Sequence, residues 1–161
     1  MDALFWNEMK KEKNLAQEFI SSHQGKSIYL YGAGVSANVA VEFAYKHNIQ
    51  ILGIVDSYKE GMFTPPAPYS PIPIVSLETF LKQKHERSPE FLISAVSFGK
   101  EIVEILAKHF PRENIHYFVI DIYTAFIPDI DAYRHYLESH SQMFQQLSES
   151  LADEDSRKTL D

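Results

Sequence analysis

A turn of two glycines and one alanine is the part of this chain best suited to bind a charged ligand. Gly32, Gly34 and Ala37 follow an apolar run and precede a helical pattern, which gives the spacing Gly-x-Gly-x-x-Ala. In such a turn the first glycine permits a tight bend, the second lets the backbone approach a phosphate, and the small third residue lets helix and strand pack closely. The N–H groups at the start of the helix favour an anion. We therefore expect a phosphate to be bound by Gly32, Ala33, Gly34, Val35 and Ser36.

An acidic side chain follows at the distance that a ribose-binding site requires. Asp56 stands 22 residues after Gly34, at the end of the next apolar run. An acid there accepts hydrogen bonds from ribose hydroxyls and repels a 2′-phosphate, so we expect NAD or a nucleotide-sugar and not NADP. S-adenosylmethionine is not expected in this turn, because Leu30 and Ser36 stand where its sites usually have an acid and a third glycine.

A loop of small and hydroxyl residues from Ser94 to Gly99 contains one more candidate. In a doubly wound sheet this loop and the glycine turn border the same crevice, so Ser97 could bond a phosphate or a sugar. The alternative is that Ser97 caps the helix that follows, since serine is favoured there with or without a ligand. Both interpretations are open from the sequence.

Catalytic and metal-binding patterns are not recognisable in the sequence. The chain has no cysteine, and its seven histidines form no His-x-His or His-x-x-x-His pair, so we expect no metal site. It also has no Gly-x-Ser-x-Gly and no Tyr-x-x-x-Lys spacing. We therefore expect that this chain is not catalytic by itself.

The elements that must position these residues alternate along the chain. Hydrophobic periodicity predicts an N-terminal helix and then strands separated by helices, while five prolines over residues 57–73 predict a loop across the sheet edge. This alternation predicts an α/β fold, a Rossmann-like doubly wound parallel sheet of about four to five strands with helices on both faces. The expected strands are 27–31, 49–55, 91–96 and 115–120, and the expected helices are 2–23, 35–47, 76–85 and 99–110.

A last helix is expected from Asp129 to Leu151. Its apolar residues recur at steps of 4 and 3, a 3.5-residue period typical of a helix that packs along another helix. This helix either extends as an arm that pairs with a second copy of the chain or folds back onto its own domain. The expected organisation is an N-terminal helix over 1–25, a nucleotide-binding domain over 26–124, and a helical arm and interdomain linker over 125–161.

Length, composition and charge limit the function classes. The chain has 161 residues, 45% of them hydrophobic, which is typical of one folded domain with a tail. Its net charge is −7, and residues 129–161 hold eight acids against three bases. No basic stripe and no apolar run near the ~18 residues of a membrane helix is present, so we expect neither nucleic-acid binding nor membrane insertion. The N-terminus is not typical of a secretory signal, and we expect a cytoplasmic protein.

Several segments resemble a bacterial module of surface-polysaccharide biosynthesis. They are the glycine turn, the strand end from Gly53 to Asp56, the helix start from Pro73 to Glu78, and the tail from Leu151 to Leu160, which reads LADEDSRKTL. Together they resemble the small Rossmann-like domain that precedes the catalytic part of FkbM-type methyltransferases, and the tail is similar to the segment that bridges its two domains. More distantly, the chain resembles the N-terminal domain of sugar acyltransferases, although their Gly-Gly-His is replaced by Gly34-Val35-Ser36.

The resemblance implies a nucleotide- or nucleotide-sugar-binding accessory domain of a glycan-modifying methyltransferase. S-adenosylmethionine would then be held only by a downstream domain, because this sequence ends where that domain would begin. Two alternatives stay open: a small NAD-dependent oxidoreductase or epimerase, and a Rossmann-like dimerisation module that binds no ligand and pairs through its C-terminal helix.

Overall fold

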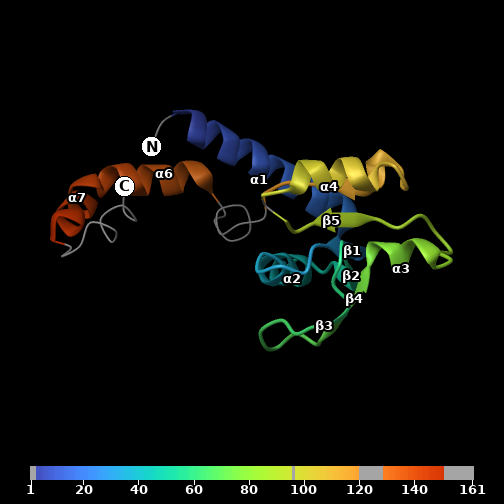
Figure 1. Cartoon of the computed structure of the whole chain (residues 1–161). Coiled ribbons are helices and arrows are strands. Elements are labelled where there is room, and N and C mark those ends of the chain that lie inside the picture. Colours follow the sequence, from blue (N-terminus) through green and yellow to red (C-terminus); the bar gives the residue numbers. More distant parts are fainter. Residues whose placement is uncertain (1–2, 96, 120–128, 151–161) are drawn as a thin grey trace.

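One six-stranded sheet with helices on both faces organises the protein. The computed structural model describes residues 3–95, 97–119 and 129–150 (Figure 1). The strands lie in the order β3-β4-β2-β1-β5-β6, and all neighbours are parallel except β3 and β4. This confirms the expected α/β class. The strands are β1 (Ser27–Tyr31), β2 (Gln50–Asp56), β3 (Gly61–Phe63), β4 (Ile72–Ser76), β5 (Phe91–Ile93) and β6 (Ile115–His116).

The helices differ from the expected ranges mainly at their ends. The N-terminal helix is confirmed as α1 (Ala3–His23), while the next helix begins two residues later than expected, as α2 (Ala37–Lys46). Ser76 caps α3 as its hydroxyl accepts a hydrogen bond from the Thr79 N–H at 3.2 Å. The remaining helices are α3 (Leu77–Lys82), α4 (Gly99–Leu106), the 3₁₀ turn η1 (Arg112–Asn114), α6 (Ile130–Ser139) and α7 (Ser141–Ser150).

The period-2 alternation of β1 divides the core into two layers. Ile28 and Leu30 face one side, where α1 and α2 pack on the sheet through side chains such as Phe19 and Phe43. Tyr31 faces the other side, where Phe80 of α3 and Val103 and Leu106 of α4 complete a second cluster. Successive side chains of a strand point to opposite faces, so strands buried on both sides read as continuous apolar runs.

The proline-rich segment is more ordered than its sequence predicts. We expected a loop over residues 57–73, whereas β3 and β4 form an antiparallel pair there and Met62 lies opposite Pro73. The expectation of a loop was wrong because a strand next to the sheet edge can contain a proline. The edge strand β3 has only three residues, so few hydrogen bonds between β3 and β4 are lost because Pro73 has no N–H.

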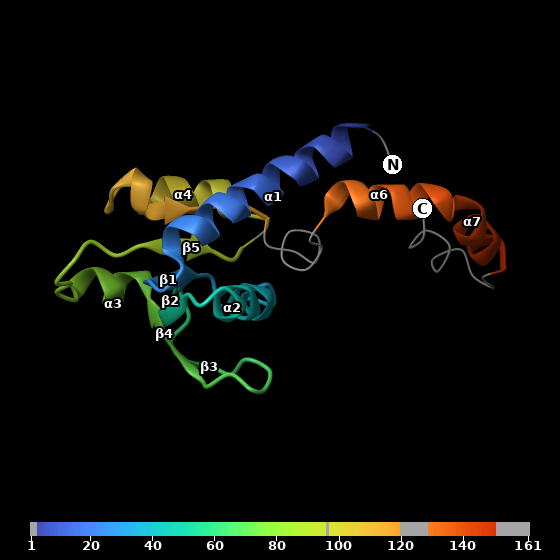
Figure 2. The same ribbon diagram turned by 180° about the vertical axis from the view of Figure 1, so that it is seen from behind.

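The C-terminal helical region consists of two helices and not of one. Asp129 begins α6 as its side chain accepts a hydrogen bond from the Ala132 N–H at 3.0 Å, but the helix ends at a cap on His140. The expectation of one helix from Asp129 to Leu151 was therefore wrong. Both helices lie to one side of the sheet, beyond the N-terminal half of α1 (Figure 2). There Tyr133 and Leu137 pack around Trp6 and Met9 of α1.

Some expectations fall outside the described residues. They are the strand end at Val96, the domain boundary at 124/125 and the tail from Leu151 to Leu160 that carries part of the family resemblance.

Candidate functional site

The glycine turn joins β1 to α2 at the carboxyl end of the sheet. Gly32 has a φ of +106°, in the region that favours glycine, and its N–H donates to the Val55 carbonyl at 2.8 Å. A Cβ on Gly32 would lie 3.1 Å from the Ser94 hydroxyl oxygen. The first glycine of the motif is therefore required both by its backbone conformation and by the close approach of Ser94 in the loop after β5.

The other small residues of the motif have different surroundings. Ala37 is fully buried under the helix start, as expected for the residue that lets helix and strand pack closely. At Gly34 an added Cβ would meet no atom within 4 Å, and its φ is not positive. Packing within the described chain therefore does not require this second glycine.

The amide groups of Gly34, Val35 and Ser36 are open at the surface. Gly34 and Val35 are exposed, and Ser36 stands at the N-cap of α2 without a side-chain capping bond. Within the described part of the chain, these three N–H groups have no hydrogen-bond partner. Unpaired N–H groups that lead into a helix form a surface that favours anions.

Asp56 binds the glycine turn and its own following loop. Its Oδ2 accepts a hydrogen bond from the Ala33 N–H at 2.9 Å, and its Oδ1 accepts from the N–H groups of Tyr58 and Lys59, both at 3.1 Å. The Lys59 ammonium donates to the Ala33 carbonyl at 3.0 Å. The predicted ribose acceptor is thus the residue that holds the turn in place, and its carboxylate keeps lone pairs for further donors.

These contacts change the acidity of Asp56. Burial would raise the pKa of this carboxyl, but the hydrogen bonds from three backbone N–H groups and the charge of Lys59 outweigh burial and lower the pKa below its usual range. The carboxylate is therefore ionised at neutral pH.

Ser94, and not Ser97, connects the second loop to the glycine turn. The buried Ser94 hydroxyl lies 2.7 Å from the Gly32 carbonyl oxygen and 3.0 Å from that of Tyr31, and it donates to them. Ser97 is exposed, and the N-cap of α4 is Phe98 without a side-chain bond. The alternative that Ser97 caps this helix is therefore wrong. Ser94 was not predicted because its role depends on the pairing of β1 with β5.

A second group of polar side chains lies near the opposite end of the sheet. His23 from the end of α1, Glu90 just before β5 and His116 of β6 bring their donor atoms within 4.8 Å of one another. Burial lowers the pKa of His116 to about 4. Sequence reasoning missed this cluster because 67 residues separate His23 from Glu90.

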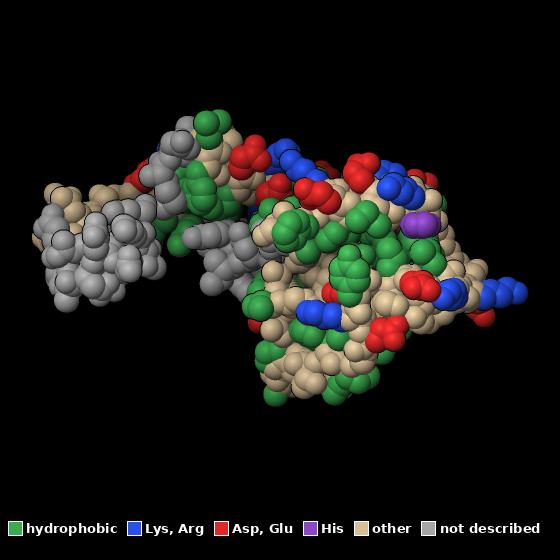
Figure 3. All heavy atoms as spheres, in the orientation of Figure 1, with side chains coloured by type: hydrophobic (Ala, Val, Ile, Leu, Met, Phe, Trp, Pro, Cys, Tyr) green, Lys and Arg blue, Asp and Glu red, His purple; other side chains and the backbone are tan. Residues whose placement is uncertain are grey.

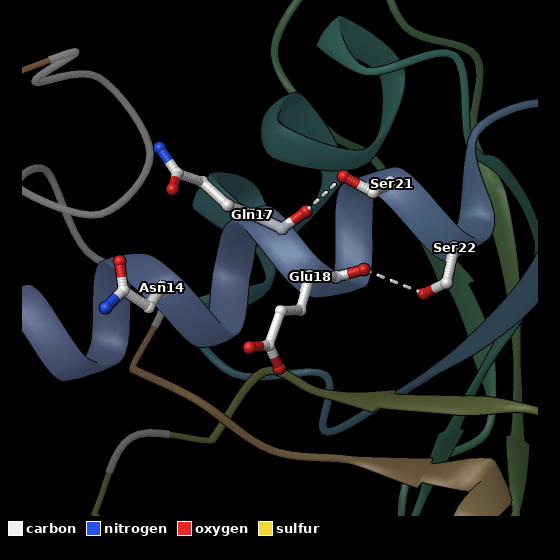
Figure 4. Close-up of a pocket in the computed structure, with 5 residues that line it drawn as sticks. All are labelled: Asn14, Gln17, Glu18, Ser21 and Ser22. Atoms are coloured by element: carbon white, nitrogen blue, oxygen red, sulfur yellow. Dashed lines mark hydrogen bonds between the residues drawn. The ribbon is translucent and has the colours of Figure 1, made fainter.

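A shallow hollow lined by residues of α1 is not built for a ligand. Five residues line it, and its volume is about 540 Å³ (Figure 4). The Ser21 hydroxyl donates to the Gln17 carbonyl at 2.9 Å, and the Ser22 hydroxyl to that of Glu18 at 2.8 Å. These hydroxyl groups are therefore used by the helix that carries them.

The surface charge and the helices bear on possible partners. Lys and Arg side chains are interspersed with Asp and Glu on the face shown in Figure 3 and form no continuous stripe there. Among the described helices, none has the length and apolar character needed to span a bilayer.

In comparisons with known proteins, no family model, no curated protein and no solved structure matches this chain.

Proposed function

We propose that the carboxyl end of the sheet around β1 and β5 binds the phosphate and ribose of a nucleotide or nucleotide-sugar. The three open N–H groups of residues 34–36 carry this proposal, because they stand on an exposed turn that leads into the ten-residue helix α2. Phosphate bound there would complete the hydrogen bonding of a helix start that lacks a side-chain cap.

The order of the strands supports a ligand at this position. The parallel strands lie in the order β4-β2-β1-β5-β6. The chain therefore adds β2 and β4 on one side of β1 and then crosses over to add β5 and β6 on the other side. This is the order 3-2-1-4-5 of Rossmann-like folds, in which ligands bind where the order reverses, outside the carboxyl ends of the strands. Gly32 and Ser94 meet at that reversal.

The charges around the turn support a diphosphate without a 2′-phosphate. The Lys59 ammonium donates a hydrogen bond to the Ala33 carbonyl and thus provides a positive charge beside the turn. The ionised Asp56 would accept a ribose hydroxyl through a remaining lone pair and would repel a 2′-phosphate. NAD and nucleotide-sugars fit this combination, and the Tyr58 ring, 92% exposed, is available to stack on a base.

Calorimetric titration of the chain with NAD, with a UDP-sugar and with S-adenosylmethionine tests the proposal. We expect saturable heat with NAD or the UDP-sugar and none with S-adenosylmethionine. Gly34→Asp should abolish binding, since it places a carboxylate against the phosphates at a position where the fold has space for a side chain. Absence of heat with both nucleotides would contradict the proposal.

A matched pair of lysine variants separates the specific site from general charge. Lys59→Met removes the ammonium beside the turn and should weaken nucleotide binding about tenfold, the typical contribution of one charged hydrogen bond. Lys84→Met removes the same charge from a pocket lined by Ser27, Glu86 and Glu90 and should leave the affinity unchanged. Equal effects of the two substitutions would contradict a site at the glycine turn.

The resemblance to FkbM-type methyltransferases suggests in which larger protein this domain would bind the nucleotide. We infer that the domain serves as the accessory, non-catalytic part of an FkbM-like glycan-modifying methyltransferase. The DNA that follows the codon for Asp161 tests this inference. An open reading frame that continues into an acidic residue-x-Gly-x-Gly motif supports it, and a stop codon at that position contradicts it.

A further inference from the structure

We propose that His23, Glu90 and His116 form a binding site for a divalent transition-metal ion of the zinc class. The three residues come from the end of α1, the segment before β5 and strand β6, so a bound ion would join the N-terminal helix to the edge of the sheet. This site lies apart from the glycine turn and does not depend on the proposed nucleotide function.

The proton on His23 is fixed by a backbone carbonyl. The Nδ1 atom lies 2.9 Å from the Phe19 carbonyl oxygen, which can only accept, and 2.8 Å from the Ser22 hydroxyl oxygen. The Ser22 hydroxyl donates its own proton to the Glu18 carbonyl, so Nδ1 carries the proton. In a neutral ring Nε2 then holds a lone pair, and this atom contacts Glu90 Oε2. Two acceptors in contact repel each other unless a proton or a cation lies between them, and a metal-binding histidine typically donates its other N–H to such a carbonyl.

His116 supplies a second nitrogen that the protein does not use. Its Nε2 is buried and has no hydrogen-bond partner within the described chain, and it lies 3.7 Å from Glu90 Oε2, too far for a hydrogen bond. A neutral imidazole has a lone pair on one ring nitrogen, which a metal ion can bind. A buried polar atom without a partner is costly, and a metal ion would remove that cost.

The donor set selects the class of ion. Two imidazole nitrogens and one carboxylate oxygen suit zinc and its neighbours better than calcium or magnesium, which prefer oxygen. Tetrahedral zinc with bonds of about 2.0–2.1 Å needs ligand atoms about 3.3 Å apart, so side-chain shifts of about 1 Å would complete the site. The Glu90 carboxylate offsets part of the ion's charge, while the positive charge of Arg112 nearby opposes it.

Solvent can reach one side of the cluster. His23 is almost fully buried, but about a third of the Glu90 side chain and a quarter of the His116 side chain are exposed. A hollow of about 320 Å³ lined by Ser22, Arg112 and His116 opens beside them. It leaves room for a water molecule as the fourth ligand.

Metal titration of the intact, chelator-treated chain tests this site. Zinc should bind with a stoichiometry of one in competition with a chromophoric chelator and should raise the urea midpoint of unfolding. Cobalt(II) should give the visible absorption of a tetrahedral nitrogen–oxygen site. His116→Gln and Glu90→Gln should each weaken zinc binding by more than about 100-fold. The loss should be this large because removal of a ligand costs more affinity than the change of a residue that only supports a ligand.

Control variants address surface histidines and folding. His109→Gln and Glu104→Gln make the same chemical changes at exposed positions on or beside α4 and should leave zinc affinity and the cobalt spectrum unchanged. Circular dichroism of each variant without metal checks that it folds. Because His116 and Glu90 are partly exposed, their Gln variants test the site without replacing the buried His23.

Three results would overturn the proposal. The first is the absence of stoichiometric zinc binding by the wild-type chain, and the second is an equal affinity in wild type, His116→Gln and His109→Gln. The third is a downfield His23 proton signal in the NMR spectrum that persists unchanged at saturating zinc, since it would show that a proton joins His23 to Glu90.

Discussion

At the residue scale, the carboxylate of Asp56 links the end of β2 to the glycine turn. Its hydrogen bond from the Ala33 N–H crosses from the end of β2 to the end of β1, while those from Tyr58 and Lys59 hold the loop that follows β2. Any ligand that bonds Asp56 therefore meets a side chain that the chain has already oriented. Such preorganisation reduces the entropy lost on binding.

The acidity of Asp56 predicts a pH-dependent stability. Its pKa is lower in the folded chain than the ordinary value near 3.9. The stabilisation is therefore fully present above about pH 4 and is lost as the pH falls through the lower folded value. Asp56→Asn should lower the unfolding free energy by about 1–3 kcal/mol at pH 7. This difference should shrink in urea titrations below about pH 4.

Glu104→Gln is the control, because it removes a carboxylate from an exposed position of α4. A difference between wild type and Asp56→Asn that stays constant from pH 7 to pH 2 would contradict the assigned role.

The two glycines of the turn should respond differently to alanine. Gly32→Ala adds a Cβ at positive φ and 3.1 Å from the Ser94 oxygen, so we expect a loss of about 1–3 kcal/mol in unfolding free energy. Gly34→Ala meets no neighbour and should change it by less than about 1 kcal/mol. Urea denaturation of both variants measures the difference, and equal losses would refute this assignment.

At the scale of elements, α4 begins against an aromatic ring. An alanine Cβ at Gly99 would lie 1.9 Å from the nearest ring carbon of Tyr117, so the ring would have to move. Gly99→Ala should therefore cost about 1–3 kcal/mol, the usual effect of overpacking. Lys100→Ala, at the next, exposed position, should cost less than about 0.5 kcal/mol. Thermal unfolding compares them, and a Gly99→Ala protein as stable as wild type would show that the ring moves freely.

Elements were predictable where local chemistry decides them. The helices α3 and α6 begin where the sequence predicts, at Ser76 and Asp129, because an N-cap needs only its own helix. The strand β4 was not predictable from Ile72, Pro73 and Ile74, because its pairing depends on β2 and β3 on either side. The break at His140 was likewise hidden in a continuous apolar pattern.

At the scale of the whole molecule, α1 connects the sheet to the C-terminal helices. Its later residues pack on β1 and α2, while Trp6 and Met9 pack with Ile130 of α6. The Lys10 ammonium lies 2.6 Å from the Asp131 carboxylate, and Arg134 lies over the Trp6 ring at 5.8 Å. The apolar side chains of α6 thus contact the chain's own N-terminal helix.

Trp6→Ala should release α6 without unfolding the sheet. The Trp6 side chain is 3% exposed, and truncation of a buried tryptophan costs about 3–5 kcal/mol. Hydrogen exchange should therefore speed up in α6, while the amides of β1 and β2 keep their protection. Leu4→Ala, at a side chain 73% exposed, is the control and should leave exchange unchanged. Unchanged protection of α6 in Trp6→Ala would contradict this contact.

The sequence by itself determined the α/β class and the position of the glycine turn, because both follow from local periodicity and backbone conformation. The Asp56 carboxylate reaches the glycine turn, where it accepts a hydrogen bond from the Ala33 N–H. Only the tertiary structure decided that Ser94 joins the turn and that His23, Glu90 and His116 converge. Those contacts join residues far apart in the chain, which no local pattern records. For the same reason, only the tertiary structure shows that α6 packs against α1.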